Sequence, residues 1–289
     1  MDADAVEVDD ACLRGWPLPQ PEADGDKEER GRVLVIAGSR EMPGALILAA
    51  NAALNAGAGK LTVATAASVA RLVATALPEA RVIELAETEA GGTNRSASER
   101  VRELLPHVDA VLIGPGMQDE PAVCEFCAAL LDHLSTSTLV LDAAAMGVVR
   151  GSAPPIESFA SATILTPHAG ELAHLTGDDK EAICDRPASA ALGAARHWNA
   201  IVALKGATTF IAAPDGSLWR HAGGNVGLAI SGSGDVLAGL SQAWRRAAHR
   251  QRKRQCGASR CTHARVGDWR AAQAHSVISR ATYPQRCRH

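Results

Sequence analysis

Arg32-Val-Leu-Val-Ile-Ala-Gly38 is a continuous apolar run that ends in glycine. A strand buried on both faces of a parallel sheet has this pattern, whereas a strand with one solvated face alternates polar and apolar residues. Gly44 to Asn55 follows as an alanine-rich stretch that predicts a helix, and Lys60-Leu-Thr-Val-Ala-Thr65 predicts a second strand. The order strand, helix, strand indicates a βαβ unit.

The same alternation recurs along the chain. Further strands are expected at Val108–Ile113, Thr138–Leu141, Ala162–Leu165, Ile201–Leu204 and Thr209–Ala212, with a helix ending at Leu134 and a hairpin turn at Pro214-Asp-Gly216. This predicts one α/β domain with a mainly parallel central sheet flanked by helices. Ligands of such folds bind beyond the carboxyl ends of the strands. Polar or glycine-rich residues stand at those ends: Gly38-Ser39, Gly114-Pro-Gly116, Asp142, Thr166-Pro-His168 and Lys205-Gly206.

Composition excludes several classes of protein. Of the 289 residues, 47% are apolar and 21% charged, which allows a sizeable core and excludes global disorder. The 29 basic and 32 acidic residues give a net charge of −3, so nucleic acid is not an expected partner. Asn51 and Asn55 interrupt the longest apolar stretch, so no membrane span is expected. Seven cysteines and an acidic start without an apolar signal predict a reducing cytoplasm.

Charge is unevenly distributed, which divides the chain into three parts. Residues 1–30 hold ten acids and three bases and are expected to be a poorly ordered leader. Residues 31–240 carry the strand and helix pattern of the domain. Residues 241–289 hold 12 bases and one acid, a net charge of +11, against −14 for residues 1–240. Two explanations of this atypical basic segment stay open: a shifted reading frame, or a genuine basic tail.

Residues 223–239 carry the strongest functional signal. Gly232-Ser-Gly-Asp235 precedes the helical residues Val236-Leu-Ala. Such a loop aims backbone N–H groups at one point beside a helix N-terminus, where the helix dipole favours a phosphate. Asp235 is then a candidate general base that deprotonates a hydroxyl attacking the phosphoryl group. The alternative is that Asp235 only caps the helix.

Two other patterns have structural interpretations. Gly57-Ala-Gly59-Lys60 lacks the first glycine and the following hydroxyl of a P-loop, so a helix end leading into a strand is expected. Cys124 and Cys127 are three residues apart on one helix face, and without a second pair they are expected to pack in the core.

Taken together, the motifs resemble the ADP-dependent NAD(P)H-hydrate dehydratase family, a branch of the three-layer ribokinase-like fold. The resemblance covers about Gly31 to Gly239 and lies in motifs that follow the family order. They are Val35-Ile-Ala-Gly-Ser39, Met42-Pro-Gly-Ala45, Ala56-Gly-Ala-Gly-Lys-Leu61, Ile113-Gly-Pro-Gly116, Leu141-Asp-Ala143, Leu165-Thr-Pro-His-Ala-Gly-Glu171, Leu204-Lys-Gly206 and Gly224-Asn225 through Gly239.

The resemblance implies a repair enzyme that dehydrates the S epimer of hydrated NADH or NADPH, consuming ADP or ATP. Asp235 would be the catalytic residue, and Ala45, Gly116 and His168 would join it in binding the hydrated dinucleotide. Lys205, Gly206, Ala207, Thr208, Thr209 and Gly234 would hold the AMP portion of the nucleotide. Gly232, Ser233 and Gly234 would form the anion hole, with the amides of residues 233–235 as donors. Mg²⁺ is implied, although no carboxylate cluster names its ligands.

The family pattern also implies partners and shows departures. A homo-oligomer, such as a homotetramer, is expected, and a separate NAD(P)H-hydrate epimerase would act with it, because residues 1–30 cannot encode the fused epimerase domain. Ser231 replaces the usual first glycine of the loop, a change that costs little if its φ is negative. Ala169 replaces a frequent proline. Rival functions are another ribokinase-like kinase, of hydroxyethylthiazole or hydroxymethylpyrimidine type, and an inactive binding-only homologue.

Overall fold

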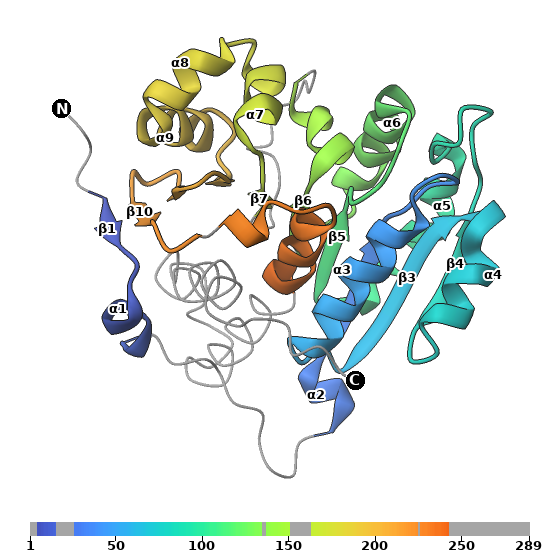
Figure 1. Ribbon diagram of the computed structural model, residues 1–289. Helices are drawn as coiled ribbons and strands as arrows, with labels where there is room; N and C mark the ends of the chain where they lie inside the picture. The colour runs from blue at the N-terminus through green and yellow to red at the C-terminus, as the bar shows by residue number, and fades with distance from the viewer. Residues whose placement is uncertain (1–4, 16–25, 135–136, 151–162, 225, 243–289) are drawn as a thin grey trace.

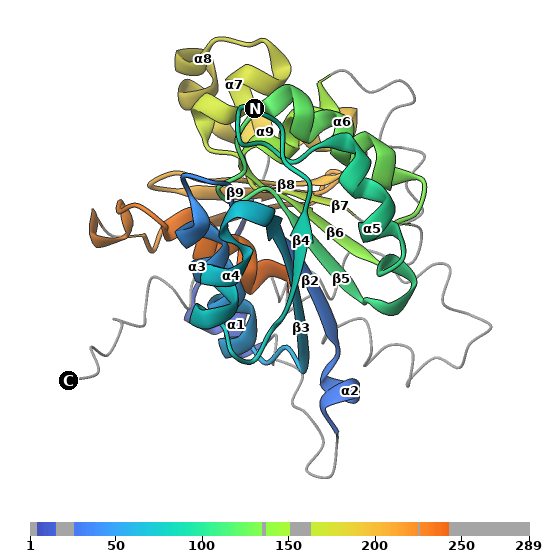
Figure 2. The ribbon, with the colours of Figure 1, turned by 90° about the vertical axis from the view of Figure 1, so that its right-hand side faces the viewer.

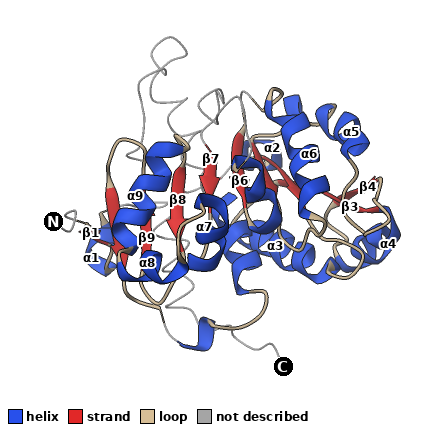
Figure 3. Ribbon diagram, turned by 90° about the horizontal axis from the view of Figure 1, so that it is seen from above, coloured by secondary structure: helices blue, strands red, loops and turns tan. Residues whose placement is uncertain are grey.

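A computed structural model describes residues 5–15, 26–134, 137–150, 163–224 and 226–242 (Figure 1). Ten strands within these residues form one sheet, and Figure 3 shows them as a row seen from above. From one edge to the other they are β1 (Val6–Glu7), β10 (Leu218–His221), β9 (Thr209–Ala212), β8 (Ile201–Leu204), β7 (Thr163–Leu165), β6 (Thr138–Leu141), β5 (Ala110–Ile113), β2 (Arg32–Ile36), β3 (Lys60–Ala66) and β4 (Arg81–Leu85). Only β9 runs antiparallel to its two neighbours.

Helices cover both faces of the sheet and make three layers (Figure 2). One face carries α3 (Pro43–Asn55), α4 (Ala67–Ala76) and a helix at residues 233–242. The other carries α5 (Ser98–Arg102), α6 (Glu120–Leu131), α7 (Ala169–Thr176), α8 (Lys180–Asp185) and α9 (Pro187–His197). Short elements complete the description: α1 (Asp10–Arg14), α2 (Lys27–Arg30), and the 3-10 turns Arg95–Ala97, Leu105–His107, Ala143–Val149 and Val226–Leu228. The predicted α/β architecture with a mainly parallel sheet is confirmed.

The apolar runs explain why the central strands were predictable. All four residues of β5, β6 and β8 are buried, as expected when helices cover both faces. β4 was not predicted, because the exposed charged residues Arg81 and Glu84 break its apolar run at the sheet edge. The predicted helix before Leu134 ends earlier, at Leu131.

The prediction of a disordered leader is wrong for residues 5–15. β1 pairs in parallel with β10, and Val8 N–H donates to Arg220 O at 2.8 Å. Val8 and Leu13 are buried against Trp219 and its neighbours. A few apolar residues among acids suffice here, because the antiparallel end of the sheet supplies an edge and an apolar face to cover. Residues 16–25, and the basic segment beyond Gln242 with its two explanations, lie outside the described residues.

The interpretation of Cys124 and Cys127 as packing residues is confirmed for Cys127, which is fully buried in the core beneath α6. Burial raises the pKa of the Cys124 thiol to about 11, and burial raises the pKa of Cys127 further. Both thiols therefore stay protonated near neutral pH, which is unsuited to metal binding or thiolate chemistry.

We expect Gly193→Ala to stabilise the protein. Gly193 lies exposed inside α9, and a Cβ added there would meet no atom of the described residues within 4 Å. Alanine lowers the conformational entropy of the unfolded chain and favours the helix, which should raise the free energy of unfolding by about 0.5–1 kcal/mol. Urea denaturation followed by circular dichroism measures the change. An unchanged or lower free energy would contradict this reading of the helix.

Candidate active site

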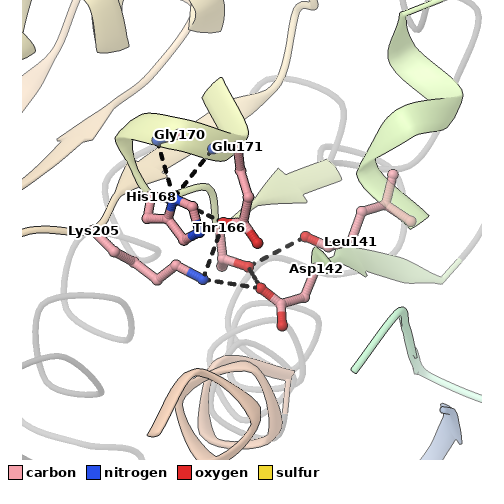
Figure 4. Close-up of polar contacts among 7 residues, drawn as sticks. All are labelled: Leu141, Asp142, Thr166, His168, Gly170, Glu171 and Lys205. Carbon is pink, nitrogen blue, oxygen red and sulfur yellow. Dashed lines mark hydrogen bonds and ion pairs between the residues drawn. The ribbon is translucent and has the colours of Figure 1, made fainter. Parts of the chain in front are cut away.

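Three neighbouring parallel strands bring polar residues together at their carboxyl ends. Asp142 follows β6, Thr166 follows β7 and Lys205 follows β8 (Figure 4). The Thr166 hydroxyl donates to Asp142 Oδ1 at 2.6 Å, and Lys205 Nζ lies 3.2 Å from the same oxygen. Asp142 is only 3% exposed, so its charge depends on these two partners.

The start of α7 adds a fourth group to this cluster. His168 caps the helix, because its Nδ1 accepts from the backbone N–H groups of Gly170 at 3.0 Å and Glu171 at 3.1 Å. The Glu171 carboxylate accepts from the backbone N–H of His168 at 2.7 Å, which completes a capping box. Glu171 Oε2 also lies 3.6 Å from Lys205 Nζ, so two carboxylates face one ammonium group.

The predicted glycine loop closes the cluster from the opposite face of the sheet. Gly232 has φ +82°, a conformation that favours glycine, and a Cβ there would lie 2.4 Å from Leu48 Cδ1 of α3. A Cβ built on Gly234 would lie 3.7 Å from Lys205 Nζ. A Cβ on Gly239 would strike the Ala49 carbonyl oxygen at 2.1 Å, so the helix at 233–242 packs directly on α3. The Lys205 ammonium group and the glycine loop therefore lie side by side.

Asp235 is the third residue of this helix, not the residue that precedes it. Its Oδ2 would lie 3.8 Å from a Cβ on Gly232, so the carboxylate folds back over the loop. Ser233 N–H donates to Ile230 O at 3.3 Å, so in this conformation that amide of the predicted anion hole is already engaged. Ser231 is not among the described residues with positive φ, so serine costs little where the family has glycine.

Two of the four residues predicted to bind the dinucleotide, Ala45 and Gly116, are in contact. Gly116 has φ +65°, and a Cβ there would lie 2.5 Å from the Cβ of Ala45 in the first turn of α3. Gly38 N–H donates to Pro115 O at 2.7 Å, which joins the loop after β5 to the end of β2. Ala45 and Gly116 are thus in contact, and His168 stands across the strand ends on α7.

The predicted nucleotide segment lines an open cavity of about 700 Å³. Lys205, Gly206, Ala207 and Thr208 form one wall, and the turn between α8 and α9 forms another. Thr209 differs from them, because it is the first residue of β9 and is only 8% exposed. Within the segment 205–209, Thr209 is therefore the residue least suited to contact a ligand through its side chain.

The sequence prediction named no role for Asp142, Thr166 or Glu171 in the site. All three did stand in motifs at predicted strand ends, which was the available signal. What could not be predicted is that they converge on Lys205, because the convergence depends on the pairing of β6, β7 and β8 in register.

A sequence model of the NAD(P)H-hydrate dehydratase family matches residues 33–284. The chain belongs to this family. A protein of Xanthomonas campestris named ADP-dependent (S)-NAD(P)H-hydrate dehydratase is 49% identical over 230 residues, which are 80% of this chain and 76% of that protein. A bifunctional NAD(P)H-hydrate repair enzyme of Moorella thermoacetica is 40% identical over 223 residues, and the match spans 77% of this chain but only 42% of that enzyme.

Two solved structures share the fold of this chain. The ADP/ATP-dependent NAD(P)H-hydrate dehydratase of Bacillus subtilis, co-crystallised with ATP and Mg²⁺, superposes with a TM-score of 0.70 at 27% identity, covering 96% of this chain and 98% of that one. A ribokinase-like superfamily protein of Enterococcus faecalis has a TM-score of 0.69 at 22% identity, covering 97% of each chain. The expected ribokinase-like fold is confirmed.

Proposed function

We propose that this member of the dehydratase family restores NADH or NADPH from the S epimer of its hydrate, with ADP or ATP as phosphoryl donor. The observation that carries the proposal is the meeting of Lys205, the Gly232–Gly234 loop and Asp235 at one end of the sheet. A cation, a helix N-terminus and a carboxylate side by side suit the transfer of a phosphoryl group to a hydroxyl. The names of the Xanthomonas and Bacillus relatives support the substrate and the donor.

A nucleotide is needed because hydroxide is a poor leaving group. Hydroxide leaves a hydrated nicotinamide ring slowly, so the hydroxyl first attacks the terminal phosphoryl group of the nucleotide and AMP leaves when ADP is the donor. Asp235 takes the hydroxyl proton, a contribution of roughly 10²–10⁴ in rate. Phosphate then leaves with the electrons of the C–O bond and a ring proton is lost, which restores the double bond. Amides at the start of the helix at 233–242 stabilise the phosphoryl group, at about 3 kcal/mol for a single donor.

In this proposal Ala45, Gly116, His168 and Asp235 bind the dinucleotide, and Gly206 to Thr208 bind the AMP portion. Gly234 belongs to the anion hole, beside the Lys205 ammonium. Mg²⁺ is commonly held by one or two carboxylates together with phosphate oxygens and water. In the described residues no group of three or more acidic, His or Cys side chains is arranged for a metal, and Asp142 and Glu171 already face the Lys205 ammonium. Mg²⁺ would therefore be held mainly by the phosphate oxygens of the nucleotide and by water. The ion would offset phosphate charge.

We also propose an oligomeric state, a partner enzyme and a cellular compartment. We expect a homo-oligomer, such as a homotetramer, and a separate NAD(P)H-hydrate epimerase that supplies the S epimer. The four cysteines in the described residues are unpaired, which fits a cytoplasmic enzyme. None of the described helices is long and apolar enough to cross a membrane.

The test follows the return of reduced-nicotinamide absorbance. Purified protein, S-hydrated NADH and Mg²⁺ are mixed with ADP, with ATP or with neither. Recovery that requires a nucleotide supports the proposal and names the donor. No recovery from a cooperatively melting protein would reject it in favour of a ribokinase-like kinase, assayed on hydroxyethylthiazole and hydroxymethylpyrimidine, or of a binding-only homologue.

A further inference from the structure

The ammonium group of Lys205 lies apart from residues 206–209, the segment that follows Lys205 in the chain. Its main chain is fixed at the end of β8, where Lys205 N–H donates to Pro167 O at 2.8 Å. The side chain then extends across the strand ends to Asp142 (Figure 4). Its Nζ lies 3.7 Å from the Cβ position of Gly234, so it stands at the N-terminus of the helix at 233–242. A phosphate at this helix end would contact Lys205 directly.

The environment of Lys205 holds its ammonium group in place. Asp142 Oδ1 accepts from Thr166 at 2.6 Å and from Lys205 at 3.2 Å, while Glu171 Oε2 lies 3.6 Å from Nζ on another side. The Lys205 side chain is 20% exposed and that of Asp142 is 5% exposed, so solvent screens this pair only in part. A lysine normally samples many rotamers, and the fixed Asp142 carboxylate removes most of that freedom before a ligand arrives.

We propose that Lys205 binds the phosphoryl group that is transferred, and that Asp142 is the positioning residue that holds its ammonium there. Gly206 to Thr208 are left to bind the AMP portion. This assignment rests on the proposed function. It differs from the family resemblance, which groups Lys205 with the residues that hold the AMP portion.

Charge and atom balance support this division. During transfer from ADP, the P–O bond to the AMP oxygen breaks and AMP leaves with the electron pair, while a P–O bond forms to the substrate hydroxyl. The hydroxyl proton passes to Asp235. Negative charge is spread over the oxygens of the moving phosphoryl group, and a fixed ammonium beside the helix N-terminus is placed to stabilise it. A residue bound only to AMP would not act on that charge.

The test compares AMP with ADP in Lys205→Met. Calorimetry with Mg²⁺ gives both dissociation constants, and the hydrate assay gives turnover with ADP. We expect the AMP constant to change less than about threefold, the preference for ADP over AMP to fall at least about tenfold, and turnover to fall by about 10²–10³. Lys180→Met, which removes an exposed lysine at the start of α8, is the matched control and should change none of these.

Equal weakening of AMP and ADP would place Lys205 in the AMP site and overturn the proposal, as would an unchanged preference for ADP. Because the ADP preference is measured without turnover, the result is independent of the hydrate assay. If the wild-type protein binds both nucleotides but restores no NADH, the proposed function fails while the assignment of Lys205 to the terminal phosphoryl group still stands or falls on the binding data.

Asp142→Asn tests the positioning role. The amide oxygen can still accept from Thr166, but the charge that holds Lys205 is gone. We expect turnover to fall about tenfold or more and the ADP preference to decrease, with the KM for the hydrated dinucleotide nearly unchanged. A purely structural role would lower the melting temperature and leave the ADP preference of the folded protein as in the wild type, and that outcome would reject the role.

Discussion

Asp235→Asn should lower turnover by about 10²–10⁴ while ADP and AMP bind within about threefold of the wild type. Asparagine has the shape of aspartate but cannot accept the hydroxyl proton, so the attack on the phosphoryl group loses its base. The variant is informative because the substitution keeps volume and hydrogen-bonding capacity at a crowded place. A larger change would disturb the Gly232 loop, since Gly232 already packs against Leu48.

The competing role for Asp235 is electrostatic support of its helix. As the third residue of the helix at 233–242, its carboxylate faces the positive end of the dipole, which is worth about 0.3–1 kcal/mol. Asparagine would remove this stabilisation, so a lower melting temperature is expected under either role. Turnover separates the roles, because a helix-stabilising residue would leave turnover per folded molecule intact.

The measurement therefore pairs turnover with calorimetry on folded, purified protein. Glu125→Gln is the matched control, because it removes one negative charge from the exposed face of α6, far along the chain from the loop. That variant should retain wild-type turnover. If Asp235→Asn also keeps more than about a tenth of wild-type turnover, Asp235 is not the base and the mechanism proposed above is wrong.

The strands were predictable where both faces are covered, and less so at the edges of the sheet. Arg32–Ile36 and Ala110–Ile113 have the continuous apolar composition that a doubly covered strand requires. At the edges, β4 exposes Arg81 and Glu84, and β1 has only two residues. Neither shows the continuous apolar run of the central strands. β1 exists because β10 offers it a partner, and a long-range partner cannot be read from a local pattern.

The positions of the site residues at the strand ends were predictable, whereas their contacts were not. The expected ends of three strands put Asp142, His168 and Lys205 at one edge of the sheet, and the structure places them there. The sequence did not predict that Nδ1 of His168 accepts from the backbone of its own helix, or that Nε2 of the same ring lies 3.7 Å from Glu171 Oε2. Nor did it predict the direction of the Lys205 side chain. Both depend on side-chain rotamers chosen by neighbours from other elements.

Gly114→Ala should prevent stable folding. Gly114 has φ +131°, which residues with a Cβ rarely adopt, and a Cβ there would lie 1.7 Å from the carbonyl oxygen of Asp142. That carbonyl belongs to the backbone between β6 and the turn that begins at Ala143, itself at φ +48°. The end of β6 would have to move. The free energy of unfolding should therefore fall by more than about 4 kcal/mol, which is exceptional for a single substitution.

Gly177→Ala measures the cost of a positive φ without the steric clash that Gly114→Ala adds. Gly177 ends α7 at φ +81°, but within the part of the chain that the structure describes a Cβ there meets nothing within 4 Å. Alanine should therefore cost only the roughly 1–2 kcal/mol of a left-handed residue. Urea denaturation of both variants gives the difference, and insolubility of Gly114→Ala beside a soluble Gly177→Ala is the extreme form of the expected result. Similar costs for the two variants would show that the Asp142 carbonyl yields readily. Asp142 would then be a poor anchor for Lys205, because a residue whose backbone moves cheaply cannot fix the position of an ammonium group.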